Sequence, residues 1–131
     1  MKRAVLFGMA LACTVGAGAQ RLAEPKSVIG TWKGDSTCQI KESPCHDEVS
    51  VYRIHKGKGS DDFVIELNKV VDGQEVLFGT IDCPTGRASG TTLCRTNGDT
   101  LWGWKLEGDV LSGRLLYKGA LYRLIHLERV K

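Results

Sequence analysis

The chain lacks several features that would indicate an enzyme, a membrane-spanning protein or a nucleic-acid-binding protein. It has no glycine-rich phosphate loop, no pair of catalytic carboxylates and no flavin-binding fingerprint. None of its apolar runs reaches the roughly 20 residues that a helix needs to cross a bilayer. Its formal charge of +3 falls to +1 if Lys2 and Arg3 are removed with a leader, which predicts no general attraction to nucleic acid. We therefore predict no enzymatic activity, no cofactor and no transmembrane segment.

The first residues have the pattern of a secretory signal peptide, which we predict over residues 1–19. A basic start precedes the short apolar run Ala4–Ala12, and Ala17-Gly18-Ala19 supplies the small-x-small pattern of a cleavage site. A partial lipoprotein box at Leu11-Ala12-Cys13 leaves a lipid anchor at Cys13 open as an alternative. The expected location is therefore secreted or periplasmic, or lipid-anchored to the cell envelope.

After a polar linker over residues 20–27, the remaining chain is long enough for one domain, residues 28–131. Either cleavage leaves four cysteines in this domain, and in an exported protein these predict two disulfides. We favour the pairs Cys38–Cys45 and Cys83–Cys94, because each pair brackets a loop rich in turn residues. A metal site that uses Cys38, Cys45 and His46 is the alternative, but the spacings do not match common zinc patterns, so we predict no metal.

The domain contains short β-branched, aromatic and leucine-rich runs separated by glycine and acidic turn residues, and no stretch has convincing helical periodicity. Asp72-Gly73 and Asn97-Gly98 suit two-residue hairpins, and Gly108-Asp109 and Gly119 mark two further reversals. Short links of this kind join antiparallel neighbours. The runs predict eight strands: Val28–Ser36, Glu48–Lys56, Asp62–Val71, Gln74–Asp82, Thr92–Thr96, Thr100–Leu106, Val110–Lys118 and Ala120–Val130.

Alternation along these strands predicts one apolar face and one solvent-exposed face. Phe63, Ile65 and Leu67, for example, share the apolar face of their strand. With no helix to cover the apolar face, the sheet must curl onto itself. We therefore predict an all-β fold, an eight-stranded antiparallel up-and-down barrel, with a two-sheet sandwich as the alternative. The last strand breaks the pattern, since Arg123 and Arg129 share a face with apolar residues. Either a bulge or an inward-turned guanidinium would explain this.

The segment Gly30-Thr31-Trp32 and the meander order resemble the calycin group, which includes lipocalins, fatty-acid-binding proteins and avidins. The resemblance implies a lipocalin-like barrel in which Trp32 packs across the closed end near Arg129 or Arg123. An arginine stacked on an indole would gain roughly 0.5–2 kcal/mol. The chain is much shorter than full-size lipocalins and lacks their C-terminal helix, which makes a small or filled barrel more plausible than a roomy cup.

The expected ligand contacts are three aromatic residues of the apolar faces together with Tyr122 and Arg123. Trp102 and Trp104 lie two residues apart on one strand, so their indoles are neighbours that form either core or pocket wall if inward, or an exposed strip if outward. Phe63 would contribute apolar surface, Tyr122 or Arg123 would orient the ligand, and Tyr117 and Tyr122 could line one mouth. The functional prediction is an exported barrel that binds a small, partly apolar ligand. The alternative is a protein-interaction module, such as an envelope inhibitor with a filled barrel.

His46, His55 and His126 are the candidates for acid–base chemistry, with Ser36, Ser43 and Ser50 in the region of His46. Spacing alone assembles no nucleophile with a matched base from them, so we interpret them as residues of loops and strand surfaces.

Overall fold

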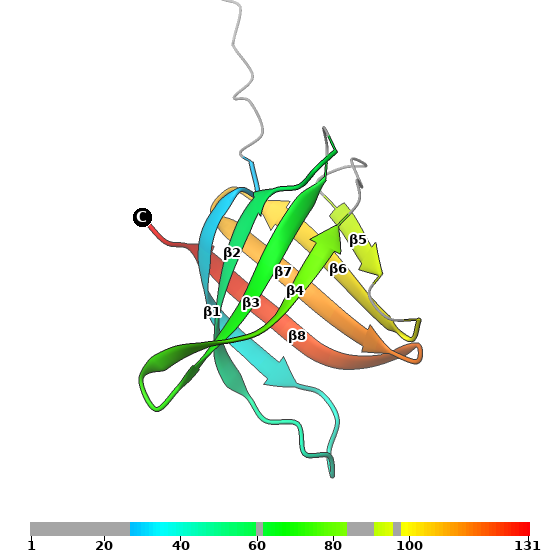
Figure 1. Ribbon diagram of the computed structural model, residues 1–131. Helices are drawn as coiled ribbons and strands as arrows, with labels where there is room; N and C mark the ends of the chain where they lie inside the picture. The colour runs from blue at the N-terminus through cyan, green and yellow to red at the C-terminus, as the bar shows by residue number, and fades with distance from the viewer. Residues whose placement is uncertain (1–26, 60–61, 84–90, 96–97) are drawn as a thin grey trace, which may run out of the picture.

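Backbone pairing joins the strands into one antiparallel sheet (Figure 1). The computed structural model describes residues 27–59, 62–83, 91–95 and 98–131, so the predicted signal peptide, Cys13 and Asn97 lie outside the described residues. Seven strands contain eight to ten residues, and β5 contains five. The strands are β1 (Gly30–Cys38), β2 (Glu48–Lys56), β3 (Phe63–Val71), β4 (Gln74–Cys83), β5 (Thr91–Arg95), β6 (Thr100–Glu107), β7 (Val110–Tyr117) and β8 (Ala120–Arg129).

The order across the sheet is β4-β3-β2-β1-β8-β7-β6-β5. Strands that follow one another in sequence therefore pair, except β4 and β5, and the first and last strands also pair, with Trp32 opposite Arg129. The turns suit this meander, since Asp72 and Gly73 both have positive φ, at 50° and 78°. The predicted all-β, antiparallel class is confirmed.

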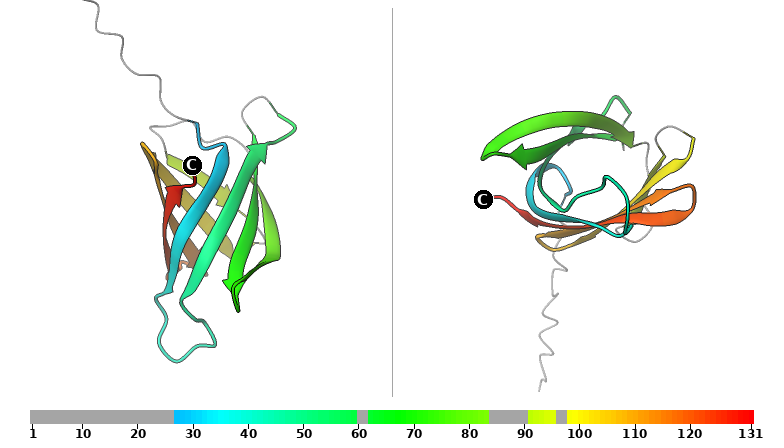
Figure 2. Two further views of the ribbon diagram at one scale, coloured as in Figure 1. Left: turned by 90° about the vertical axis from the view of Figure 1, so that its left-hand side faces the viewer. Right: turned by 90° about the horizontal axis from the view of Figure 1, so that it is seen from below.

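The predicted closed barrel is wrong. Within the described residues β4 and β5 are the two edges of the sheet and form no ladder with each other, so the sheet is a curled half-barrel (Figure 2). The strand β5 is half the length of β4, and it pairs over its five residues with β6 only. In addition, the register of β4 against β3 shifts beside Leu67 and Asn68, which leaves Phe78 as an extra, bulged residue. A bulge bends its strand and increases the local twist.

A disulfide joins the two edges instead. Cys83, the last residue of β4, is bonded to Cys94 in β5, and both side chains are buried. The second disulfide, Cys38–Cys45, closes the loop between β1 and β2. Both favoured pairings are confirmed, and disulfides of this kind indicate an oxidising environment.

The concave side of the sheet is filled by packed side chains from both halves of the chain. Tyr52 of β2 meets Trp104 of β6 edge-to-face, with ring centroids 5.8 Å apart. The cluster is largely apolar and includes residues of all eight strands: Trp32, Tyr52, Ile54, Phe63, Ile65, Leu67, Ile81, Cys83, Cys94, Trp102, Trp104, Leu111, Leu115, Ile125 and Leu127. The interior is therefore a core rather than a cup.

Among the described residues, no helical segment has the length and hydropathy needed to cross a bilayer.

Candidate functional site

Trp32 lies at the end of the sheet where the chain enters β1. Its side chain is fully buried, and its Nε1–H donates a hydrogen bond to the carbonyl of Val28 at 2.8 Å. The guanidinium carbon of Arg129, from β8, lies 4.3 Å from the centroid of the indole. The resemblance to the calycin group implied this contact between Trp32 and an arginine of the last strand. The guanidinium lies over the indole as in a cation–π interaction, and Trp32 is a buried plug at this end of the sheet.

Arg129 also ties the entering segment to the sheet. Its Nε donates to Asp109 at 3.0 Å, and its two terminal nitrogens donate to the carbonyls of Ile29 and Ser27 at 3.0 and 2.6 Å. Gly30 has a φ of +139°, and a Cβ there would lie 3.1 Å from Arg129 Nη1. A side chain at Gly30 would be strained by the backbone and would crowd the guanidinium, which accounts for glycine at this position.

Trp102 and Trp104 point inward, with exposed fractions of 5% and 3%. Their rings stack, with centroids 5.6 Å apart and planes 9° apart. Neither indole lines the cavity beside Phe63 or the cavity between Tyr117 and Tyr122. A Cβ at Gly113 would lie 2.4 Å from the Trp104 ring, so the indole packs directly on the backbone of β7. The structure therefore places both indoles in the core. Burial also raises the pKa of their neighbour Tyr52 to about 12, because the phenolate would be desolvated there.

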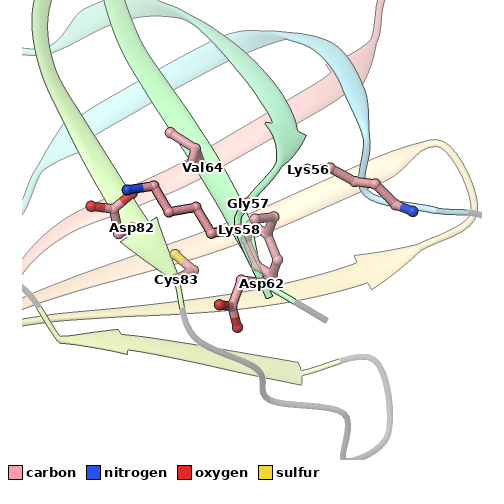
Figure 3. Close-up of a pocket in the computed structure, with 8 residues that line it drawn as sticks. Lys56, Gly57, Lys58, Asp62, Val64, Asp82 and Cys83 are labelled. Carbon is pink, nitrogen blue, oxygen red and sulfur yellow. The ribbon is translucent and has the colours of Figure 1, made fainter. Parts of the chain in front are cut away.

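Phe63 lines a cavity of about 510 Å³ at the end of the sheet that holds Trp32 (Figure 3). Lys56, Lys58, Asp62 and Asp82 also line it. The backbone N–H of Gly57 bonds the carbonyl of Asp62 at 2.8 Å, which closes the connection that carries these residues. Two ammonium groups and two carboxylates give the cavity no excess of one charge, so it has no evident preference for an ionic ligand.

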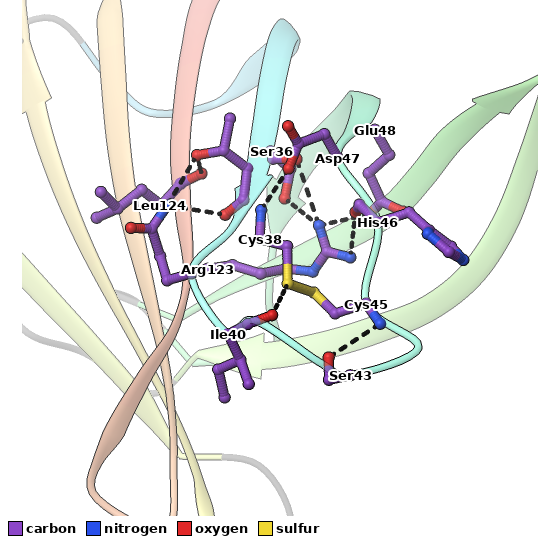
Figure 4. The surroundings of a disulfide bond; sticks show 12 residues. Ser36, Cys38, Ile40, Ser43, Cys45, His46, Asp47, Glu48, Arg123 and Leu124 are labelled. Carbon is purple, nitrogen blue, oxygen red and sulfur yellow. Dashed lines mark hydrogen bonds and ion pairs between the residues drawn. A yellow bond between two sulfur atoms is a disulfide. The ribbon is translucent and has the colours of Figure 1, made fainter.

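Arg123 turns inward at the opposite end and holds the loop between β1 and β2 (Figure 4). It donates to Ser36 Oγ at 3.0 Å and to the carbonyl of His46 at 2.8 Å, and it lies 3.7 Å from a carboxylate oxygen of Glu48. The side chain is 12% exposed. Because Asp47 also accepts from the backbone N–H of Cys38 at 2.8 Å, the disulfide loop is anchored from both sides. Arg123 is thus engaged within the chain rather than directed at a ligand.

The last strand has both features that could explain its irregular pattern, a bulge and an inward-turned guanidinium. The register of β8 against β7 shifts so that Leu115 faces Arg123 and Leu116 faces Leu121, which leaves Tyr122 as an extra residue. The bulge and the inward guanidinium are therefore adjacent.

Tyr122 lies beside Tyr117 at the mouth next to Arg123, with ring centroids 6.4 Å apart and planes at 65°. The two rings, Leu115 and Thr100 line a cavity of about 240 Å³. The structure thus brings together the two tyrosines expected to share a mouth. Arg123 lies beside them but is bonded within the chain, and Phe63, Trp102 and Trp104 do not line this cavity.

The histidines lie on the surface. His46, His55 and His126 are exposed, and His55 Nε2 is 2.8 Å from a carboxylate oxygen of Glu66. In the described part of the chain no group of three or more His, Cys, Asp or Glu side chains is arranged to hold a metal ion.

One group of exposed apolar residues was not predicted from the sequence. Val76, Leu77 and Phe78 of β4 are 44%, 58% and 48% exposed, and Val71 across the hairpin is 43% exposed. We call these four residues the β4 strip. The sequence does contain a signal for this exposure. Val76, Leu77 and Phe78 are three consecutive apolar residues, which breaks the alternation expected of a strand with one solvent-exposed face.

No family model matches the chain, and no curated protein or solved structure matches it either. The resemblance to the calycin group therefore remains a prediction.

Proposed function

We propose that this protein is an exported binding protein for a small, partly apolar molecule built on a single planar ring, held at the mouth between Tyr117 and Tyr122. The observation that carries the proposal is the cavity of about 240 Å³ between these two rings. Ligand sites usually occupy roughly 300–1,000 Å³, so a smaller cavity suits a ligand of one ring.

The sequence builds the cavity with a turn and a bulge. Lys118 and Gly119, with φ of 49° and 80°, form the two-residue reversal that follows Tyr117. The extra residue in β8 then allows Tyr122 to pack against the core next to inward Arg123. Bulges often re-aim a side chain beside a binding site.

The lining favours an aromatic ligand over a sugar. Leu115 is an apolar floor, the walls are phenol rings, and the polar groups are the hydroxyls of Thr100, Tyr117 and Tyr122. A sugar carries more hydroxyl groups than such a site can pair, and each one left buried without a partner costs about 1–3 kcal/mol. A planar ring with one polar substituent would bury its faces and keep one hydrogen bond.

Export is supported by the two disulfides together with the signal-peptide pattern of residues 1–19. The filled interior supports the alternative function, a protein-interaction module, which predicts no saturable binding of small rings at this mouth.

Titration with phenol, followed by two-dimensional NMR, tests the proposal. Leu115 is paired with Trp102, so a ligand on this floor should shift the Trp102 indole N–H signal as well as the amides of Thr100, Tyr117 and Tyr122. We expect saturable shifts with phenol and at least tenfold weaker binding of cyclohexanol, which has a similar size but is not planar.

Tyr122→Ala should abolish the shifts, whereas Tyr122→Phe should weaken binding only about fivefold, through the loss of one hydrogen bond. Val49→Ala, an exposed position on β2, is the control and should bind like wild type. Shifts that do not saturate, or that persist in a folded Tyr122→Ala protein, would refute the proposal in favour of the interaction module.

A further inference from the structure

We infer that β4 pairs edge to edge with β4 of a second copy of this chain, so that Val76, Leu77 and Phe78 contact the same residues of the other copy in a twofold dimer. This inference is independent of the small-ligand proposal, because it concerns the edge strand β4, whereas the proposed ligand site lies on the inner strands β6, β7 and β8. It starts from the position of β4 at the end of the strand order, with β3 on one side only.

The free part of this edge is its first half. Near its end, β4 is joined to β5 by Cys83–Cys94, but Gln74 to Phe78 are all exposed. The β3–β4 hairpin projects beyond the rest of the sheet, so a second molecule can approach this edge (Figure 1). An unpaired edge presents a row of backbone N–H and C=O groups that another strand can complete.

This edge lacks the usual protection against pairing. Free edges of natural proteins carry lysine or proline, or are covered. The strand Gln74–Cys83 contains neither residue type, and it exposes three consecutive apolar side chains at its free half. Its protective features are the charges of Glu75 and Asp82, which lie outside the apolar segment, and the bulge at Phe78. Such an edge is expected to be covered in the working protein.

Two charged side chains beside the strip are engaged within the chain. Glu75 accepts two hydrogen bonds from Arg53, which lower its pKa, and the ammonium of Lys69 lies 5.8 Å from the centroid of the Phe78 ring. The apolar segment Val76, Leu77 and Phe78 itself carries no charge. A neutral, apolar strand is the complementary surface.

The first half of β4 in a second copy of the chain is such a strand. In a twofold antiparallel pair centred on Leu77, the opposed positions are Leu77 with Leu77 and Val76 with Phe78. Glu75, the charged residue of the segment Gln74–Thr80, would face Gly79 of the other copy. No like charges would be opposed in this ladder, and apolar cross-strand pairs stabilise sheets. Charge and pattern together therefore favour a second copy as the occupant.

Sedimentation of the full mature protein over a range of concentrations tests the inference. We expect a reversible monomer–dimer equilibrium, and Leu77→Lys, which opposes two ammonium groups at the twofold axis, should weaken it at least a hundredfold. Leu124→Lys is the matched control, because Leu124 is similarly exposed but lies on β8, an inner strand of the sheet. Its dimerisation should equal that of wild type.

Leu77→Cys provides a second readout that tolerates small changes in stability. Under oxidising conditions it should form a disulfide-linked dimer, whereas Val49→Cys should not, with the native disulfides verified by mass spectrometry. A monomer at every concentration, a dimer unaffected by Leu77→Lys, or equal cross-linking of both cysteine variants would overturn the inference. A monomer whose β4 strip binds another protein would identify a different occupant and also overturn it. None of these outcomes depends on whether phenol binds.

Discussion

The two halves of the sheet, β1–β4 and β5–β8, meet along two seams that are held by different means. At the seam of β1 and β8, backbone pairing runs from Trp32 opposite Arg129 to Cys38 opposite Arg123. At the seam of β4 and β5, the described residues form no ladder, and the Cys83–Cys94 disulfide spans it with a Cα–Cα distance of 4.9 Å. The comparison indicates that a covalent bond joins the two halves where the backbone forms no ladder.

The side chains and backbone packed at the two seams also differ. The β1–β8 seam is crossed by the stacking of Arg129 on Trp32 and by a close backbone approach at Gly34, where a Cβ would lie 2.0 Å from the carbonyl oxygen of His126. The β4–β5 seam has the buried cysteines behind it, and the first half of β4 extends past it with its apolar residues exposed. The first seam is therefore expected to carry most of the stability.

The largest effect should come from Trp32→Ala, which removes the plug of the paired seam. Truncation of a fully buried indole should lower the free energy of unfolding by about 4 kcal/mol, through lost burial and an unfilled cavity. Urea denaturation measures this change. A loss below about 1 kcal/mol would contradict the assignment of Trp32 as a structural plug.

Gly34→Ala tests the close approach of β1 and β8. The added methyl group meets backbone that cannot move aside, so we expect a loss of about 3 kcal/mol. Gly79→Ala is the matched control, because a Cβ there would meet only a Leu67 methyl carbon at 3.8 Å. Equal stability of the two variants would show that the β1–β8 seam is not tightly packed.

The double change Cys83→Ser with Cys94→Ser opens the other seam. Releasing this short loop should cost about 2.5 kcal/mol in the chain-entropy description. Hydrogen exchange should accelerate in β4 and β5 before it changes in β1 and β8. Uniform acceleration across all strands would mean that the disulfide supports the whole sheet rather than one seam.

The smallest effect concerns Tyr52, which links the halves through the interior. Its pKa is raised from 10.0 to about 12 by burial, so its stabilising contribution is fully present below pH 10 and is lost as pH rises towards 12. Between pH 10 and 11 the free energy of unfolding should fall by about 1 kcal/mol more in wild type than in Tyr52→Phe. Tyr117→Phe, at an exposed ring, should behave like wild type, and parallel pH profiles for all three proteins would contradict the buried state of the phenol.

Much of the fold was predictable because its signals are local. The predicted strands agree with the observed ones within two residues at each end, as in Val28–Ser36 against Gly30–Cys38 for β1. Turn residues such as Asp72-Gly73 require positive φ, which few other sequences tolerate, so they mark strand ends reliably. The two disulfides followed from cysteines that bracket short loops.

The site was less predictable, because alternation says which residues share a face but not which face is inside. It placed Trp102 and Trp104 side by side, yet only the packing against Tyr52 and Gly113 shows that they belong to the core. The sequence marked Arg123 as breaking the strand pattern, but its partners Ser36, His46 and Glu48 lie far away in the sequence. The mouth of Tyr117 and Tyr122 was recognised because a tight turn holds them together.

By itself, the sequence determined an all-β, antiparallel meander with two local disulfides, because turn chemistry and hydrophobic period act over a few residues. Only the tertiary structure decided that the sheet stays open, that its interior is filled and that one edge is left exposed. The bulges at Phe78 and Tyr122 contribute to those outcomes, because each one bends its strand. A bulge is a misfit between two strands, so neither strand's sequence specifies it alone.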